Sequence, residues 1–237
     1  MIEMKVELIS YSNLGEKVCG IASKTCVSEN IPDMDDDVMK SLISAINSGH
    51  ESVLEHWSAT FAVSGVSRAL THQLVRHRVA SYSQQSQRYV DMDGFDYVVP
   101  ESILNCPDSL EQFKWGMKAI QKVYKTLLAY GIDMEDARYI LPNACTTNII
   151  VSMNARQLRH FFALRCCNCA QWEIRELADK MLELVKEVAP MIFENAGPSC
   201  VQAGYCPEGK RSCGRAVTLG RMLDIVDEQR TAKRECH

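Results

Sequence analysis

The sequence predicts an α/β protein of the α+β kind, in which a small, mostly antiparallel sheet is packed by long helices. Short runs of alternating or β-branched residues lie between much longer stretches of helical periodicity. No glycine-rich fingerprint follows a predicted strand, and the chain contains no Walker sequence. These two observations favour a helix-covered antiparallel sheet over a doubly wound parallel sheet.

Length and composition indicate one globular core. The chain has 237 residues, of which 46% are hydrophobic and 24% are charged. A chain of this size buries enough surface for a single domain. We expect that domain to cover residues 1–196, followed by a Cys-rich tail over residues 197–237.

The composition also predicts where the protein works. No apolar run approaches the roughly 18 residues that span a bilayer, and the amino terminus carries Glu3 and no apolar signal segment. We therefore expect no membrane partner, and we expect the eleven cysteines to be reduced thiols in the cytoplasm. A formal net charge of -4 argues against a dedicated nucleic-acid-binding protein.

Local patterns predict the elements of the first hundred residues. They are a strand at 4–10, a helix from the acidic segment 33–37 to the residue before Gly49, a strand at 57–66, a helix from Ser67 through Arg78, a Ser/Gln-rich loop and an extended piece at 97–100. Residues 16–30 are polar and contain cysteines, and no element is assigned to them.

The second half of the chain is predicted to be mainly helical. Its predicted elements are an amphipathic helix at 108–130, a helix from Asp133 ended by Pro142, a strand at 146–153, a helix from its cap Asn154 through Arg165, a long helix from Trp172 to Ile192 and a short charged helix at 219–237.

Residues 76–88 are the most unusual stretch of the chain. They hold three arginines, one histidine, three serines and three glutamines, and residues 66–90 contain no Asp or Glu. An acidic protein with one basic, carboxylate-free segment is expected to bind an anion there. Guanidinium groups suit phosphate or carboxylate oxygens, whereas the alternative interpretation is a solvated basic surface.

Two further patterns leave alternatives open. Arg165 continues the apolar stripe of Leu158 and Phe162, so its cation needs either a structural ion pair or a bound anion. His50 and His56 lie six residues apart with two glutamates between them, whereas a zinc-binding His-Glu-x-x-His pair requires a separation of four. This spacing argues against a metal site at residues 50–56.

The spacing within residues 76–88 resembles the signature of the flavin-dependent thymidylate synthases. The matching residues are Arg76, His77, Arg78, Ser81, Ser86 and Arg88. Further segments are similar in order and spacing, namely 135–138 with 141–142, 154–156, 164–165 and 170–174. The similarity extends over roughly residues 36–190.

This resemblance implies the same kind of α/β fold, with a small sheet packed by helices, and it also implies an activity and an assembly. The implied activity is the reductive methylation of dUMP to dTMP by a catalytic domain over 1–196. FAD would be the cofactor, and methylenetetrahydrofolate and NADPH the co-substrates. The implied assembly is a homotetramer with sites between subunits.

The resemblance also implies site residues. Those implied to hold dUMP are Gln73, Arg76, Gln84, Gln85, Ser86, Gln87, Arg88, Arg138 and Arg165. Those implied to contact FAD are His50, Ser52, Arg76, His77, Arg78, Gln84, Asn154, Arg156 and His160. Arg165 would be catalytic, because a fixed cation at the uracil edge stabilises charge that develops on the ring. Ser86 would form a positioning hydrogen bond rather than act as a nucleophile.

The chain departs from the family pattern at two of these positions. Gln84 stands where the family often has an acidic residue, and His160 where it often has Asn. Gln84 keeps an acceptor without the charge, and His160 keeps a donor.

The Cys-rich tail predicts a second kind of site. Residues 197–214 have few apolar side chains that could order them, so a structural zinc on Cys167, Cys200, Cys206 and Cys213 is one expectation and free thiols are the other. A zinc site of this kind would fit one alternative to the thymidylate synthase hypothesis, a zinc-stabilised nucleic-acid-binding protein. A second alternative is a flavoprotein with other chemistry on the same fold.

Overall fold

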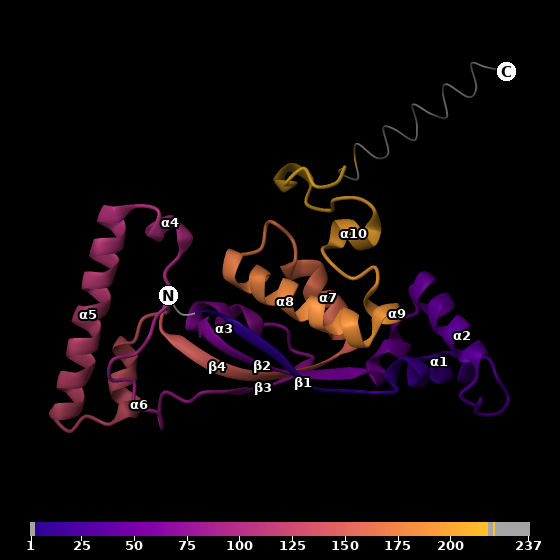
Figure 1. The fold of residues 1–237 in the computed structure, drawn as a ribbon, viewed down its shortest axis with the longest axis horizontal. Helices are drawn as coiled ribbons and strands as arrows, with labels where there is room; N and C mark the ends of the chain where they lie inside the picture. Colours follow the sequence, from indigo (N-terminus) through magenta and orange to yellow (C-terminus); the bar gives the residue numbers. More distant parts are fainter. Residues whose placement is uncertain (1–2, 218–219, 221–237) are drawn as a thin grey trace, which may run out of the picture. The chain divides into compact units, whose positions relative to one another are not determined.

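A computed structural model describes residues 3–217 and 220 of the chain (Figure 1). The described chain forms two compact units. The first consists of the chain up to Ile9 with Thr60–Ser152, and the second of Ser10–Ala59 with the chain from Met153 onward. The expected boundary between residues 196 and 197 is untested and stays a prediction, and the helix predicted at 219–237 lies outside the described residues apart from Gly220.

The predicted small antiparallel sheet is confirmed. Its strands are β1 (Lys5–Tyr11), β2 (Ser58–Ser67), β3 (Ala80–Gln84) and β4 (Thr146–Asn154), in the order β1-β2-β4-β3. Alternate residues of β4, such as Ile149 and Val151, are buried, as the two-residue period of a strand requires. On the opposite face of the sheet, the hydroxyls of Thr60 and Ser152 lie 2.7 Å apart and share a hydrogen bond.

Within the first unit, one long helix covers a core of its own. The helices of this unit are α3 (Arg68–Leu74), α4 (Glu101–Leu104), α5 (Pro107–Ala129), α6 (Met134–Ala137) and the 3-10 turn η2 (Arg138–Ile140). Met117 and Tyr124 on α5 pack in a buried cluster with Met92, Phe95 and Ala137. The Tyr124 hydroxyl accepts the backbone N–H of Met92 at 3.3 Å, which fixes the loop before α4.

Helices make up most of the second unit. They are α1 (Gly15–Thr25), α2 (Asp36–Asn47), α7 (Ala155–Arg165), α8 (Trp172–Val188), α9 (Pro190–Phe193) and α10 (Ser199–Ala203), with the 3-10 turns η1 (Glu51–His56) and η3 (Gly209–Arg211). Trp57 is fully buried and meets the Phe193 ring edge-on at 5.2 Å between centroids. A Cβ at Gly15 would lie 2.1 Å from the Trp57 ring, so the approach of α1 to Trp57 requires glycine there.

Several predicted elements are confirmed. The helix expected after the acidic segment 33–37 is α2, whose cap Asp35 accepts hydrogen bonds from the backbone N–H groups of Asp37 and Val38. The strand predicted at 57–66 is β2, and the helix predicted at 108–130 is α5. The unassigned residues 16–30 contain most of α1.

Two expectations near residue 80 are wrong. The helix from Ser67 ends at Leu74 rather than Arg78, and residues 80–84 form β3 rather than a loop. The Tyr82 hydroxyl donates to the carbonyl oxygens of Leu74 at 2.9 Å and His77 at 2.8 Å, and so satisfies acceptors at the helix end. The sheet neighbour β4 gives residues 80–84 backbone partners that no local pattern reveals.

Candidate functional site

The Arg76–Arg78 turn of the first unit directly follows α3. Ser67 caps α3 by accepting the backbone N–H of Leu70 at 3.0 Å. His77 is buried, whereas Arg76 and Arg78 are exposed. The hydrogen bond from Tyr82 to the His77 carbonyl holds this turn against β3. The guanidinium groups of Arg76 and Arg78 therefore lie at the surface. Their backbone is held by α3 before the turn and by the bond from Tyr82 after it.

The next predicted residues lie at the end of β3. The Gln84 amide donates to the hydroxyls of Thr71 at 3.0 Å and Thr147 at 3.3 Å, so its nitrogen is used within the protein. Its carbonyl oxygen remains the part of Gln84 that can accept a bond from a ligand. The backbone N–H of Gln85 donates to the backbone carbonyl oxygen of Asn148 at 2.9 Å, which continues the pairing of β3 with β4.

Arg88 and Arg138 meet at one residue, Glu135. The Arg88 guanidinium contacts the Glu135 carboxylate twice, with Nε at 2.7 Å and a terminal nitrogen at 2.5 Å from Oε2. Arg138 donates from Nε to the Glu135 backbone carbonyl at 2.9 Å. The hydrogen bond and charge of Glu135 raise the pKa of Arg88.

A third arginine adjoins this group. Arg68, the first residue of α3, is half-buried, and desolvation lowers the pKa of its guanidinium, with the positive charge of Arg138 acting in the same direction. Its backbone N–H donates to the Cys145 carbonyl at 3.0 Å, so Arg68 lies beside Cys145 and near Arg138. Sequence reasoning missed Arg68, although it belongs to the same carboxylate-free stretch of residues 66–90.

Ser86 and Gln87 lie beside these arginines in the chain. The Ser86 hydroxyl accepts the backbone N–H of Arg88 at 3.2 Å, which shapes the turn that presents Arg88. The Gln87 amide lies 4.0 Å from the Cys145 sulfur, which it approaches as a donor. Arg76 lies in the turn after α3 and is exposed there.

The second unit holds the other predicted residues around the start of α7. Asn154 caps α7, since its side-chain oxygen accepts the backbone N–H of Gln157 at 2.8 Å. Arg156 pairs with Glu55 at 2.6 Å, and His160 is exposed one turn further along. The buried Arg159 has a structural position, because it contacts Glu51 at 3.3 Å and the Ile192 carbonyl at 2.7 Å.

His50 and Ser52 line one cavity. Its volume is about 380 Å³, and residues of α1 and α2 complete its wall, among them the hydroxyls of Ser23, Ser41 and Ser44. His50 immediately precedes η1, and both predicted residues are exposed. The structure therefore brings together these two predicted flavin contacts within the second unit.

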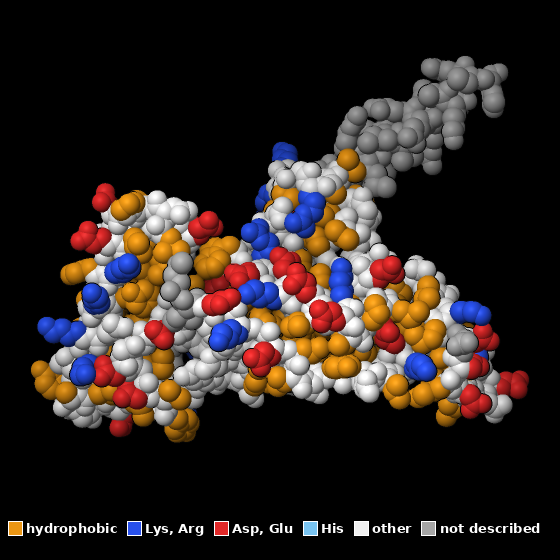
Figure 2. Space-filling view, viewed as in Figure 1, with side chains coloured by type: hydrophobic (Ala, Val, Ile, Leu, Met, Phe, Trp, Pro, Cys, Tyr) orange, Lys and Arg blue, Asp and Glu red, His pale blue; other side chains and the backbone are white. Residues whose placement is uncertain are grey.

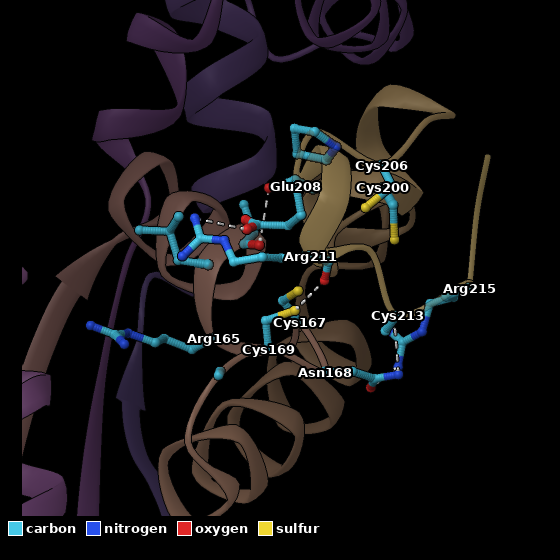
Figure 3. A pocket seen from close by; sticks show the side chains of 15 residues that line it. Arg165, Cys167, Asn168, Cys169, Cys200, Cys206, Glu208, Arg211, Cys213 and Arg215 are labelled. Carbon is cyan, nitrogen blue, oxygen red and sulfur yellow. Dashed lines mark hydrogen bonds and ion pairs between the residues drawn. The ribbon is translucent and has the colours of Figure 1, made fainter. Parts of the chain in front are cut away.

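Arg165 ends α7 and lines a different cavity. This cavity has a volume of about 280 Å³, and five cysteines share its lining: Cys167, Cys169, Cys200, Cys206 and Cys213. Figure 3 shows the Arg165 side chain extending away from the sulfur atoms. Burial lowers the pKa of the Arg165 guanidinium, the direction expected for a partly desolvated cation.

The predicted zinc site on Cys167, Cys200, Cys206 and Cys213 is not supported. Within the described part of the chain, no group of three or more His, Cys, Asp or Glu side chains is arranged to hold a metal ion.

None of the helices of residues 3–217 combines the length and the apolar character that spanning a bilayer requires.

Comparison with known proteins identifies the family. A profile described as "Thymidylate synthase complementing protein" matches residues 7–191. The chain therefore belongs to this family.

Relatives named flavin-dependent thymidylate synthase cover most of the chain. The relative from Geobacter sulfurreducens is 48% identical over an alignment of 228 residues, and the match covers 93% of this chain and 98% of the relative. The relative from Clostridium tetani is 46% identical and covers 92% of this chain and 96% of its own length. The relative from Pyrococcus abyssi is 50% identical over a shorter region, which is 73% of this chain and 75% of the relative.

A solved structure shares the fold. It is a UMP/dUMP methylase, PolB, from Streptomyces cacaoi, bound with 5-Br dUMP. The TM-score is 0.72 at 25% sequence identity, and the match covers 82% of this chain and 94% of the methylase.

Proposed function

We propose that this protein is a flavin-dependent thymidylate synthase, which methylates dUMP at C5 of the uracil ring to give dTMP. The observation that carries the proposal is the group of arginines around Glu135, which includes Arg88 of the family signature and Arg138. Family membership, relatives of that name and a fold shared with a UMP/dUMP methylase support the same conclusion.

The arginine group suits the phosphate of dUMP. Arg88 and Arg138 present guanidinium groups, whose planar forks match phosphate oxygens. Phosphate would replace Glu135 as the partner of Arg88, because a dianion competes well for an exposed ion pair. Gln73, Arg76, Gln84, Gln85, Ser86 and Gln87 complete the proposed nucleotide set, partly across a subunit boundary.

Arg165 is the proposed catalytic residue. Its half-buried cation would lie against the uracil edge and stabilise the negative charge that develops on the ring, which activates C5 toward the one-carbon unit. No protein nucleophile is needed for this role. The Ser86 hydroxyl already accepts the Arg88 N–H and so serves to position that residue.

The residues proposed for FAD have a fitting donor set. Arg76 and Arg78 are exposed cations, and the exposed His50 and Ser52 supply an imidazole and a hydroxyl, which suit a pyrophosphate and its sugars. His77, Gln84, Asn154, Arg156 and His160 are the other proposed contacts. When bound and reduced by NADPH, FAD supplies the hydride that completes the methyl group, and methylenetetrahydrofolate supplies the carbon.

A homotetramer is the proposed assembly. Sites between subunits would let the exposed Arg76 of one chain join residues of another. The surface shown in Figure 2 carries Lys and Arg interspersed with Asp and Glu, and such a mixture differs from the continuous basic patch of a nucleic-acid-binding face.

The test is an assay of the purified protein loaded with FAD. We expect NADPH oxidation that dUMP stimulates, and dTMP as a product whose methyl carbon comes from labelled methylenetetrahydrofolate. Omission of each co-substrate in turn is the control. NADPH oxidation without dTMP would indicate a flavoprotein with other chemistry and overturn the proposal.

A further inference from the structure

Five thiols border the cavity that Arg165 also lines, and three of them gather at the loop between α7 and α8 (Figure 3). Cys167 and Cys169 belong to this loop, and Cys213 comes from the segment after η3. All three are free thiols in the structure, and Cys169 and Cys213 are exposed. The proposed methylation uses none of them.

The segment with Cys213 already docks on the loop. Arg215 donates to the Asn168 side chain at 2.7 Å and to the Cys166 carbonyl at 3.4 Å. The Cys169 thiol donates to the Arg211 carbonyl at 3.3 Å. Residues two positions before and after Cys213 therefore both contact the loop that carries Cys169.

Cys213 has the surroundings of a reactive thiol. The Asn168 amide donates to its sulfur at 3.5 Å, and Asn168 directly precedes Cys169 in the chain. The backbone N–H of Arg215 lowers the pKa of Cys213 most, and the Asn168 amide and the Arg215 charge act in the same direction. An exposed thiol with such partners is more often a thiolate, the form that attacks disulfides.

Cys169 is the neighbouring thiol that can complete the reaction. It shares a hydrogen bond with the Cys167 thiol, and partial desolvation followed by the charge of Cys167 raises its pKa. Cys213 lies close enough to act on the charge of Cys169. Cys213 lies outside helix and strand beside Gly214, so no regular element need open to bring the two thiols together.

We propose that Cys213 and Cys169 form a redox-responsive thiol pair that takes low-molecular-weight disulfides as its reactant. The Cys213 thiolate attacks one sulfur of the disulfide, a mixed disulfide forms, and one small thiolate leaves. The Cys169 thiolate then attacks the Cys213 sulfur, forms the protein disulfide and releases the second small thiolate. The two cysteines lose two electrons and two protons, and the small disulfide is reduced to two thiols.

The pair would regulate the site that contains Arg165. Arg165 is the last residue of α7, and the loop with Cys169 starts at the next residue. A disulfide would tie this loop to the segment after η3 and so restrict movement of Arg165. This regulatory part depends on the proposed function, whereas the thiol chemistry does not.

The first experiment maps the disulfide. The protein is incubated with oxidised glutathione, remaining thiols are alkylated, and the digest is analysed by mass spectrometry. We expect a peptide pair linked through Cys169 and Cys213, and in Cys169→Ser we expect glutathione to remain on Cys213. Cys106→Ser is the matched control, because Cys106 is also exposed and hydrogen bonds lower its pKa, but it lies outside this cavity.

Three outcomes of the mapping overturn the thiol pair. They are no linked peptide, a link between other cysteines such as Cys200 and Cys206, or one zinc ion per chain that protects the thiols. Loss of the link in Cys106→Ser would also contradict it.

The second experiment measures dTMP formation before and after complete oxidation. We expect the rate of dTMP formation to be at least about threefold lower in the oxidised protein. A thiol reductant should restore the rate, and oxidation should not change the rate of Cys213→Ser. An unchanged rate with the disulfide fully formed removes the regulatory part and leaves the mapped pair. Loss of all activity in the reduced protein instead refutes the proposed function.

Discussion

Arg88 and Glu135 form a two-point contact through one carboxylate oxygen, Oε2, at 2.7 and 2.5 Å. Both side chains are about half exposed, at 46% and 52%. An ion pair this exposed contributes little to folding, because solvent screens it. Its significance is functional, since Glu135 occupies the guanidinium that we assign to the phosphate of dUMP.

Glu135→Gln is therefore expected to tighten dUMP binding. Removal of the competing charge should lower the Kd for dUMP by up to about fivefold. Titration calorimetry measures the change, and Glu111→Gln, which removes an exposed carboxyl from α5, should leave the Kd unchanged. Weaker binding in Glu135→Gln would show that Glu135 orients Arg88 rather than competing for it.

Arg165→Ala tests the catalytic assignment. The variant should retain its fold and flavin, because Arg165 is the last residue of α7 and is not one of the proposed flavin contacts. We expect the rate of dTMP formation to fall by about a hundredfold or more, since one charge-stabilising donor is lost. The visible spectrum and circular dichroism are the controls, and full activity would remove the role given to Arg165.

Two variants of Asn154 separate folding from flavin binding. Asn154→Ala removes the cap of α7 and should lower the free energy of unfolding by about 1 kcal/mol. Asn154→Asp keeps an equivalent cap but has no amide, so stability should change much less. Both variants should bind FAD more weakly in fluorescence titrations. Full flavin affinity in Asn154→Asp would exclude an amide contact to the flavin.

Tyr82→Phe tests how the Arg76–Arg78 turn is held. The hydroxyl is partly desolvated, which raises the pKa of Tyr82 to about 12, and it donates to the carbonyls of Leu74, the last residue of α3, and of His77 in the turn that follows. Its loss should cost about 1 kcal/mol in denaturant unfolding. It should also weaken FAD binding, because the exposed arginines lose their support. Tyr130→Phe, at an exposed tyrosine, is the matched control.

Glu16 predicts a pH dependence of stability. Desolvation raises the pKa of this carboxyl, although its contacts with the backbone of Ile192 and Met191 act against the shift. The folded state then binds a proton more tightly than the unfolded state. The resulting stability is fully present below the unfolded pKa, about 4.3, and is lost as the pH rises through the folded pKa.

In the parent protein, the free energy of unfolding should fall as the pH rises from about 4, and this fall should be smaller in Glu16→Gln. Denaturant titrations at several pH values measure it, with Glu187→Gln on the exposed face of α8 as the control. A decline that persists unchanged in Glu16→Gln would contradict the assignment.

Local chemistry allowed prediction of the elements whose ends carry their own signals. Asn154 is the cap of its helix both in the prediction and in the structure. The acidic segment 33–37 predicted the start of α2, and the structure shows that Asp35 is its cap. The β-branched residues of 146–153 likewise predicted the strand that the structure forms as β4, in which Ile149 and Val151 are buried.

The wrong predictions near β3 depend on distant partners. Ser and Gln are not among the residues enriched in strands, and the pairing of residues 80–84 with β4 is a long-range interaction that the local sequence does not reveal. At the end of α3, the Leu74 carbonyl accepts a hydrogen bond from the Tyr82 hydroxyl, eight residues away. Arg68 was missed for a similar reason, because its proximity to Arg138 is a long-range contact.

A crystal structure of the assembled protein with dUMP and FAD tests the central claim most directly. We expect the guanidinium groups of Arg76, Arg88, Arg138 and Arg165, contributed by more than one subunit, to lie within hydrogen-bond distance of a single nucleotide stacked on the flavin. Guanidinium groups directed into solvent, with dUMP bound elsewhere, would contradict the account.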